Sequence, residues 1–207
     1  MLFFLLLPSI LSIEFYVFTG SLTTKRIESL YFFIEKNTLG KNMLIGAISD
    51  THDNLPQIEK AVKYLNEQKV ELVLHAGDYV AGFVVPKFRS LNCKLIGVFG
   101  NNDGDHELLK KRFSETTNCT IHNQFATITV ESYKIALLHG TDSELLNTII
   151  DCGYFNAVVH GHSHNKSIDK KGETLAINPG ELCGYLTGKS TLAILDTKKQ
   201  EAKIIDL

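Results

Sequence analysis

Ile45-Gly-Ala-Ile-Ser-Asp-Thr-His-Asp53 is the stretch of this chain that most strongly predicts its fold. The apolar run Leu44–Ile48 indicates a short strand that is buried on both faces of a sheet. Asp50 and His52 follow, and alternate residues of an extended segment point the same way, so both should face one site. Such a pair suits a divalent ion of the first transition row. Taken alone, the stretch favours a simpler interpretation, a helix-capping aspartate and a surface histidine.

The composition is typical of one globular domain. The 207 residues suffice for a single sizeable core, and 44% hydrophobic and 21% charged residues are ordinary for a soluble protein. A net charge of −2 without a dense Lys/Arg block gives no support to a nucleic-acid or polyanion binder. The four cysteines are scattered and form no Cys-x-x-Cys pair, which argues against a disulfide framework or zinc ribbon and predicts reduced cytosolic thiols.

Residues 1–42 are predicted to be an apolar extension outside the domain. Leu2–Leu22 is long enough to cross a bilayer, although Glu14 near its middle would be costly there. It makes a poor signal peptide, since no basic residue precedes it and no small-x-small cleavage site stands out. Met43, the only internal methionine, stands immediately before the first strand of the domain.

Three interpretations of this extension stay open: an upstream start that is not used, a membrane anchor, or an extra packed helix. In the anchor case Lys25 and Arg26 follow the apolar segment, which keeps the downstream chain on the cytoplasmic face of the membrane. The domain is therefore expected in the cytoplasm, with membrane contact only if residues 2–22 act as an anchor.

The first half of the domain repeats a strand followed by a polar loop. Leu55–Leu65 has apolar residues at helical spacing, with Asn54 as a cap and Pro56 in the first turn. The next buried strands are expected at Leu72–Ala76 and Leu95–Phe99. Strands that alternate with helices indicate an α/β sheet, in which ligands bind beyond the carboxyl ends of the strands.

The loops after these strands carry further oxygen-bearing side chains. Leu72–Ala76 leads into Gly77-Asp78, and Leu95–Phe99 leads into Gly100-Asn-Asn-Asp103. We expect the glycines before Asp78 and Asn101 because the backbone has to approach a ligand closely there.

The second half of the domain is richer in hairpins. Thr127–Val130 and Lys134–Leu138 predict a hairpin that ends in His139-Gly140. A helix is expected at Ser143–Cys152, capped by Asp142, with one apolar face made by Leu145, Leu146, Ile149 and Ile150. The remaining strands are expected at Ala157–His160, Leu175–Ile177, Thr191–Leu195 and Ala202–Ile205, the last two antiparallel. Since no linker or repeat interrupts them, residues 43–207 form one domain.

Seven candidate metal ligands thus lie where strands become loops: Asp50, His52, Asp78, Asn101, His139, His162 and His164. Their pattern, Asp-x-His … Gly-Asp … Gly-Asn-x-Asp … His-Gly … Gly-His-x-His, resembles the calcineurin-like metallophosphoesterase superfamily. Gly100-Asn-Asn-Asp103 and Asn178–Gly188 are similar to its small prokaryotic phosphodiesterase branch, which is related to the retromer scaffold subunit. The resemblance extends from Met43 to the C-terminus.

The resemblance implies an α/β sandwich of two mixed sheets flanked by helices, with two metal ions at one edge. One ion would be held by Asp50, His52, Asp78 and His164, and the other by Asp78, Asn101, His139 and His162. A carboxylate can bridge two ions about 3.5–4 Å apart, which suits Asp78. The ions are expected to be manganese, with nickel, iron or zinc as alternatives, since mixed nitrogen and oxygen ligands suit all four.

The implied activity is hydrolysis of a small phosphodiester by a hydroxide that bridges the two ions. A phosphomonoesterase, a nucleotide pyrophosphatase and a non-catalytic interaction scaffold of the same fold are the alternatives, and a homo-oligomer stays open. Asn102 and Asp103 are the candidate catalytic residues, although Asp103 is expected to orient the loop. The larger phosphatases carry a histidine at Asn102 that assists the leaving group, and an amide cannot act as an acid.

The other polar residues near strand ends receive simpler interpretations. His75 and His160 are expected to lie in the core or to support ligands, and His106 and His122 to lie at the surface. Asp53 is expected to be a helix-start carboxylate. Asn178 and Gly180 are candidates for lining the substrate pocket through backbone groups.

Overall fold

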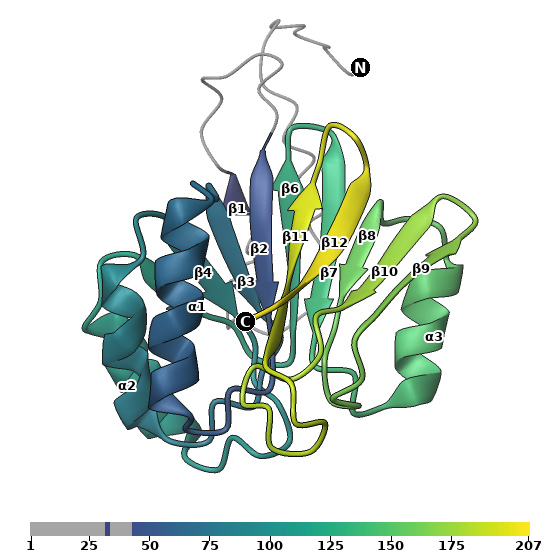
Figure 1. Ribbon diagram of the computed structural model, residues 1–207. Helices are drawn as coiled ribbons and strands as arrows, with labels where there is room; N and C mark the ends of the chain where they lie inside the picture. The colour runs from purple at the N-terminus through teal and green to yellow at the C-terminus, as the bar shows by residue number, and fades with distance from the viewer. Residues whose placement is uncertain (1–31, 34–42) are drawn as a thin grey trace, which may run out of the picture. The chain divides into compact units, whose positions relative to one another are not determined.

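The computed structural model describes residues 32–33 and 43–207 and contains two six-stranded sheets (Figure 1). The first sheet has the order β1-β6-β7-β8-β10-β9. Its strands are β1 (Phe32–Phe33), β6 (Phe125–Val130), β7 (Tyr133–Leu138), β8 (Ala157–Val159), β10 (Thr174–Asn178) and β9 (Ser167–Lys171). The second sheet has the order β12-β11-β2-β3-β4-β5. Its strands are β12 (Glu201–Asp206), β11 (Thr191–Asp196), β2 (Leu44–Ile48), β3 (Leu72–His75), β4 (Lys94–Gly97) and β5 (Cys119–Ile121).

Both sheets are mixed. In the second sheet β2, β3, β4 and β5 run parallel, while β11 is antiparallel to both of its neighbours, β2 and β12. In the first sheet β7, β8 and β10 are parallel, the hairpins β6–β7 and β9–β10 add antiparallel pairs, and β1 pairs in parallel with β6 at the edge. The parallel strands β2 to β4 therefore end at one edge, at the bottom of Figure 1, where their loops meet.

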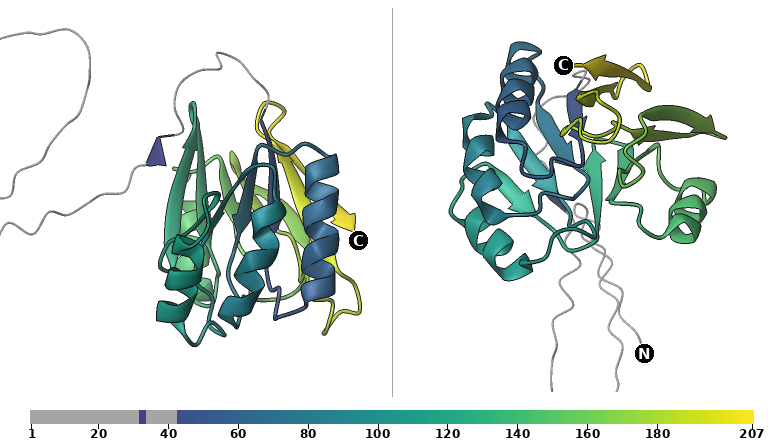
Figure 2. Two further views of the ribbon diagram at one scale, coloured as in Figure 1. Left: turned by 90° about the vertical axis from the view of Figure 1, so that its left-hand side faces the viewer. Right: turned by 60° about the horizontal axis from the view of Figure 1, so that its bottom comes forward.

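Helices cover the outer face of each sheet. Helix α1 (Leu55–Glu67), the 3₁₀ segment η1 (Gly82–Ser90) and helix α2 (His106–Ser114) pack on the second sheet. Helix α3 (Ser143–Asp151) packs on the first sheet. Figure 2 shows the two sheets between these helices, so the predicted sandwich is confirmed.

The period-two alternation of β2 divides its residues between two cores. Ile45 and Ala47 point into the apolar layer between the sheets, and Ile48 points to the helices. Gly46 also faces the helices, where an added Cβ would lie 2.5 Å from Leu65 Cδ2. The helix α1 thus rests directly on the backbone of β2, which fixes the position of the loop that follows.

The predicted helix starts are confirmed. The Asn54 side chain accepts a hydrogen bond from the Gln57 N–H at the start of α1. Asp142 accepts from the first amides of α3. One helical residue was wrongly placed: Leu145 is 52% exposed, and only Leu146, Ile149 and Ile150 face the sheet.

Five elements were not predicted: β1, η1, α2, β5 and β9. The α2 sequence buries only Leu109 and Phe113, so it carries a weak apolar period. Pro86 lies inside η1, and β5 spans three residues. None of these segments has the length or period by which sequence patterns identify an element.

The N-terminal apolar segment Leu2–Leu22 lies outside the described residues, so its three interpretations remain predictions. Within residues 43–207, where all of the described helices lie, none of the helices combines the length and apolar character needed to cross a membrane. All four cysteines are free thiols, which agrees with the prediction that they form no disulfide framework.

Candidate metal centre

Loops at the carboxyl edge of the sheets bring the predicted ligands together around Asp78. This residue follows β3 and is 1% exposed. Its Oδ2 lies 3.3 Å from His139 Nε2, which follows β7, and 3.5 Å from His52 Nε2, which follows β2. Asp50, Asp78 and His139 form one buried group that could hold a metal ion.

A second group forms around the carboxylate of Asp50. Its Oδ1 lies 3.4 Å from His164 Nε2 and 3.8 Å from His52 Nε2. Asp50 Oδ1 and His52 Nε2 are both buried and have no hydrogen-bond partner. Buried polar atoms are nearly always paired, so two unpartnered atoms that face one another point to a ligand between them.

Asn101 joins the cluster from the other side. Its Oδ1 lies 2.9 Å from His139 Nε2 and 2.8 Å from His162 Nδ1. His139 Nε2 in turn lies 3.3 Å from Asp78 Oδ2. Short contacts thus link all seven predicted ligands into one cluster. Their division between two ions stays a prediction, because Asp50, Asp78 and His139 also form one group that could hold an ion.

Fixed partners orient two of the histidine rings. His139 Nδ1 lies 2.7 Å from the Ala76 carbonyl, and His164 Nδ1 lies 2.8 Å from Glu181 Oε2. Each acceptor favours a proton on Nδ1, which leaves the Nε2 lone pair directed at the cluster. This arrangement is typical of histidines that bind metal.

Glu181 is the functional residue that sequence reasoning missed. It is fully buried, and its oxygens also accept hydrogen bonds from Leu186 N–H, Thr187 N–H and the Thr187 hydroxyl. Burial would raise the pKa of Glu181, but His164 and Thr187 outweigh it and lower the pKa to about 2. Glu181 lies in the segment Asn178–Gly188 that resembles the prokaryotic branch. That resemblance is the one feature of the sequence that could have indicated a role for this residue.

The backbone around the cluster is strained. Five of the seven predicted ligands have positive φ: Asp50 (52°), His52 (36°), Asp78 (61°), His162 (68°) and His164 (61°). The expected explanation for the convergence of Asp50 and His52 was therefore wrong, because neither residue is extended. Left-handed conformations of this kind persist at functional sites where the surroundings fix them.

The glycines of the cluster serve contacts between loops. An added Cβ on Gly77 would lie 2.6 Å from the Gly100 amide nitrogen, and one on Gly100 would collide with the Asp78 carboxylate. One on Gly161 would collide with Ser49 Oγ. The expectation that glycines admit a ligand is thus corrected: they let the loops pack against one another and against Asp78.

Asp103 holds two of these loops together. Its carboxylate is 4% exposed and accepts hydrogen bonds from the backbone amides of Asp78, Tyr79, Val80 and Gly100. Backbone amides engage both oxygens, so the geometry supports the expected role of Asp103 in orienting the loop.

Asn102 contacts Asp78 directly. Its backbone N–H donates to Asp78 Oδ1 at 2.8 Å, and its side-chain amide donates to Asp78 Oδ2 at 2.7 Å. Burial would raise the pKa of Asp78, but His139 and these bonds outweigh it and hold the pKa well below its usual range. Asp78 is therefore ionised, as a metal ligand must be.

His75 lies in the core beneath the ligand loops, as expected. Its Nδ1 accepts the Gly77 N–H at 3.1 Å and its Nε2 lies 3.2 Å from Thr51 Oγ1. Burial holds the pKa of His75 well below its usual value, so the ring is neutral. Burial also lowers the pKa of His160.

The structure also shows the surroundings of the other polar residues that the sequence singled out. His106 is not simply at the surface, because its ring stacks on Phe99 with centroids 3.9 Å apart, and His122 is half-buried. Asp53 directly precedes Asn54, the cap of α1, and its Oδ1 accepts the Ala81 N–H at 3.0 Å. Asn178 and Gly180 are both buried, and the Asn178 side chain holds the Gly161 carbonyl and the Gly180 amide. Whether their backbone groups contact a substrate stays a prediction.

The residues present fit a pair of divalent ions. The cluster contains two buried carboxylates, four imidazoles and an amide oxygen, and two of its polar atoms lack any partner within the described part of the chain. Mixed oxygen and nitrogen donors of this kind suit first-row transition metals.

Known proteins share this sequence and fold. Residues 43–200 match the family model for the calcineurin-like phosphoesterase superfamily domain. The chain is 41% identical over 165 residues to a phosphodiesterase of Methanocaldococcus jannaschii, covering 80% of this chain and 99% of the relative.

Solved structures with the same fold support this family membership. An archaeal phosphodiesterase superposes with a TM-score of 0.76 at 40% identity and covers 80% of this chain and 100% of its own. Vacuolar protein sorting 29 from Cryptosporidium parvum has a TM-score of 0.58 at 18% identity, with coverage of 80% and 97%. At that identity the likeness shows the fold alone.

Proposed function

The chain belongs to the calcineurin-like phosphoesterase superfamily, and on that premise we propose that it is a phosphodiesterase that depends on divalent metal ions. The observation that carries the proposal is the buried pair Asp50 Oδ1 and His52 Nε2, which face each other at 3.8 Å without partners. The 41% identical relative, itself a phosphodiesterase, supports the reaction type.

Two sets of ligands follow from the two groups. One ion would be held by Asp50, His52, Asp78 and His164, and the other by Asp78, Asn101, His139 and His162. Asp78 is the shared ligand because it contacts members of both sets. When bound, the ions would supply Lewis-acid polarisation of the phosphoryl oxygens and of the attacking water.

The chain's own residues prepare the site for this chemistry. Glu181 and the Ala76 carbonyl hold protons on the Nδ1 atoms of His164 and His139, so that their Nε2 lone pairs face the cluster. Asp103 joins the loops after β3 and β4 through four backbone amides. The ligands are therefore held in place before a substrate arrives, which reduces the reorganisation that the reaction requires.

Asn102 distinguishes the expected substrates. Its amide lies against Asp78 and has no acidic proton near neutral pH, so it cannot protonate a leaving group. This favours activated diesters over monoesters with poor leaving groups. The phosphomonoesterase and pyrophosphatase alternatives differ from the proposal in their substrates alone.

The non-catalytic scaffold is the alternative from a different class of function. It rests on the likeness to vacuolar protein sorting 29, which shows the fold and not a role. The full set of ligand side chains supports the enzyme instead. Manganese is the proposed ion and the cytoplasm the proposed location, the latter on the four free thiols.

Turnover of bis-(p-nitrophenyl) phosphate and p-nitrophenyl phosphate, measured with manganese and after chelation, tests the proposal. We expect faster turnover of the diester, and its loss on chelation. Faster turnover of the monoester would favour a phosphomonoesterase, and no turnover of either with the ions bound would favour the scaffold.

A further inference from the structure

A pocket of about 200 Å³ lies directly beside the proposed metal ligand His164. We call it the lysine pocket, and its lining residues are His164, Asn165, Lys166, Thr187, Lys189 and Thr191. Pockets that hold a whole small ligand usually enclose about 300–1,000 Å³. The lysine pocket is therefore large enough for one chemical group of a ligand, but not for a whole one. The rest of such a ligand could lie at the metal centre, which borders the pocket at His164.

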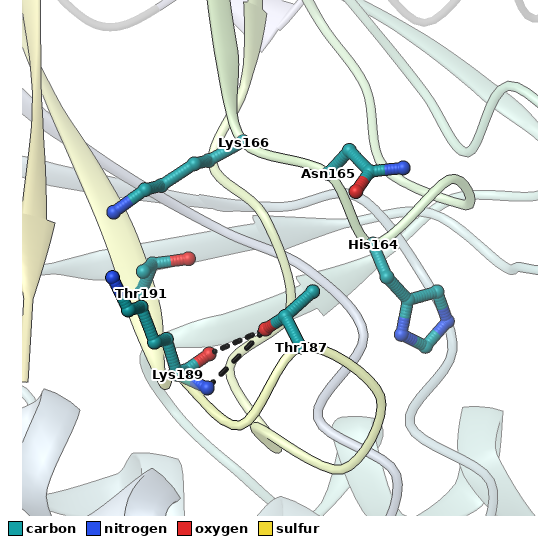
Figure 3. Close-up of a pocket in the computed structure, with 6 residues that line it drawn as sticks. All are labelled: His164, Asn165, Lys166, Thr187, Lys189 and Thr191. Carbon is teal, nitrogen blue, oxygen red and sulfur yellow. Dashed lines mark hydrogen bonds between the residues drawn. The ribbon is translucent and has the colours of Figure 1, made fainter.

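Two ammonium groups dominate the chemistry of this pocket. Figure 3 shows Lys166 and Lys189 reaching to the same side, away from the His164 ring. Lys166 forms an ion pair with Asp206 at the end of β12. Lys189 is exposed and has no ion-pair partner among the described residues. The two lysines are the charged side chains that line the pocket, and the carboxylate of Glu181 lies behind Thr187. Asp206 offsets Lys166, so Lys189 is the cation that is left for an anion.

The hydroxyl groups of the pocket are already committed as donors. Thr191 Oγ1 donates to the Pro179 carbonyl at 2.7 Å, and Thr187 Oγ1 donates to Glu181 Oε1 at 2.7 Å. The ammonium donor that remains free is that of Lys189, because the Lys166 ammonium already donates to Asp206. The pocket is thus suited to recognise charge, and lysine is a point charge that pairs well with phosphate.

The carboxylate of Asp206 reduces the positive charge of the pocket. Lys166, and to a smaller extent Lys189, lower the pKa of Asp206, so it is ionised and competes with any anion for both ammonium groups. It is exposed at the end of an edge strand and contacts none of the proposed metal ligands. Its removal should therefore strengthen anion binding and leave the metal centre intact.

We propose that the lysine pocket binds a second phosphate of the substrate, while the phosphodiester to be cleaved lies at the metal centre across His164. This inference rests on the proposed phosphodiesterase function and narrows its substrates. The preferred substrates are diesters that carry a terminal phosphate on the organic group extending past His164. Diesters without such a group are cleaved with lower kcat/KM.

A matched pair of chromogenic diesters tests the proposal in the full chain loaded with manganese. The pair is the p-nitrophenyl diester of thymidine monophosphate with and without a terminal phosphate on the other sugar oxygen. The readout is the ratio of kcat/KM for the phosphorylated to the unphosphorylated diester. We expect a ratio of about five for each ammonium that contacts the phosphate, the upper end for one exposed ion pair.

Variants outside the metal centre then change this ratio in opposite directions. Lys189→Met should lower it about five-fold, and Asp206→Asn should raise it, since the competing carboxylate is gone. Lys203→Met is the matched control, because Lys203 is an exposed lysine on the same strand as Asp206 but does not line the pocket.

The outcomes separate this inference from the function on which it rests. A ratio near one in the parent protein, or equal shifts in all three variants, would overturn the phosphate site while hydrolysis of both diesters upholds the phosphodiesterase. No hydrolysis of either diester with the ions bound would instead overturn the phosphodiesterase, and the inference with it.

Discussion

Replacing Glu181 by glutamine tests whether a buried carboxylate sets the metal affinity of His164. The Oε2 atom of Glu181 lies 2.8 Å from His164 Nδ1, while Oε1 accepts the Thr187 hydroxyl. A carboxylate can accept at both oxygens, but an amide has one oxygen and one donor group. In either orientation Glu181→Gln therefore places an NH₂ against another donor.

General magnitudes for such changes give the expected size of the effects on metal affinity and on stability. Loss of a partner that orients a metal-binding histidine costs about 10–100-fold in metal affinity. If the NH₂ faces the Thr187 side, the part-buried donors there lose their acceptor, which lowers the free energy of unfolding by about 1 kcal/mol. We therefore expect a loss of metal affinity if the NH₂ faces His164 and a loss of stability if it faces Leu186 and Thr187, so at least one of the two quantities falls.

A competition titration with a chromophoric chelator measures the affinity for manganese, and denaturant unfolding measures the stability. Glu201→Gln is the matched control, since Glu201 is an exposed carboxylate at the start of β12. Parent-like metal affinity in Glu181→Gln, with a stability equal to that of the control, would refute the role assigned to this residue.

Three further predictions follow from the site and the domain boundary. Because the pKa of Glu181 falls from 4.5 to about 2, its contribution to stability is complete above pH 4.5 and is lost as the pH falls toward 2. The unfolding free energies of the parent and Glu181→Gln should therefore converge over that range; a constant difference would contradict this. With Asn102 unable to donate a proton, kcat/KM should fall steeply as the leaving group becomes more basic, and Asn102→His should recover part of the roughly 10²–10⁴-fold that acid catalysis contributes. A shallow slope in the parent would show that another group delivers the proton. A chain that starts at Met43 should fold and hydrolyse diesters like the full chain, because it loses only the two-residue strand β1 from the described part; circular dichroism and turnover measure this, and an unfolded product would place the domain boundary further upstream.

Much of the fold was accessible from the sequence because its strands are buried on both faces. The Leu44–Ile48 run and the run that became β3 have no polar residue until they reach the edge, so their ends also locate the site. The elements that sequence reasoning missed are short or polar. Helix α2 is held by Leu109, Phe113 and the stacking of His106 on Phe99, contacts that exist only after the sheet forms.

The sequence predicted which side chains would lie close together at the site, but not the residues that hold them there. The spacing of Asp50 and His52 suggested that they lie together, yet they converge through left-handed backbone conformations that their residue types do not predict. Glu181 reaches His164 across 17 residues of chain, and Asp103 reaches Asp78 across 25. Such partners are set by how separate loops pack, which periodicity does not encode.

Metal analysis of the purified protein and of its Asp78→Asn variant measures whether the site binds two ions through this carboxylate. Asp78 Oδ2 lies within 3.5 Å of His52 Nε2 and His139 Nε2, so it is placed to serve both ions. We expect close to two transition-metal ions in the parent, a large loss of metal in Asp78→Asn, and hydrolysis that disappears with the metal. Parent protein that is free of metal and still cleaves diesters at the full rate would contradict this expectation.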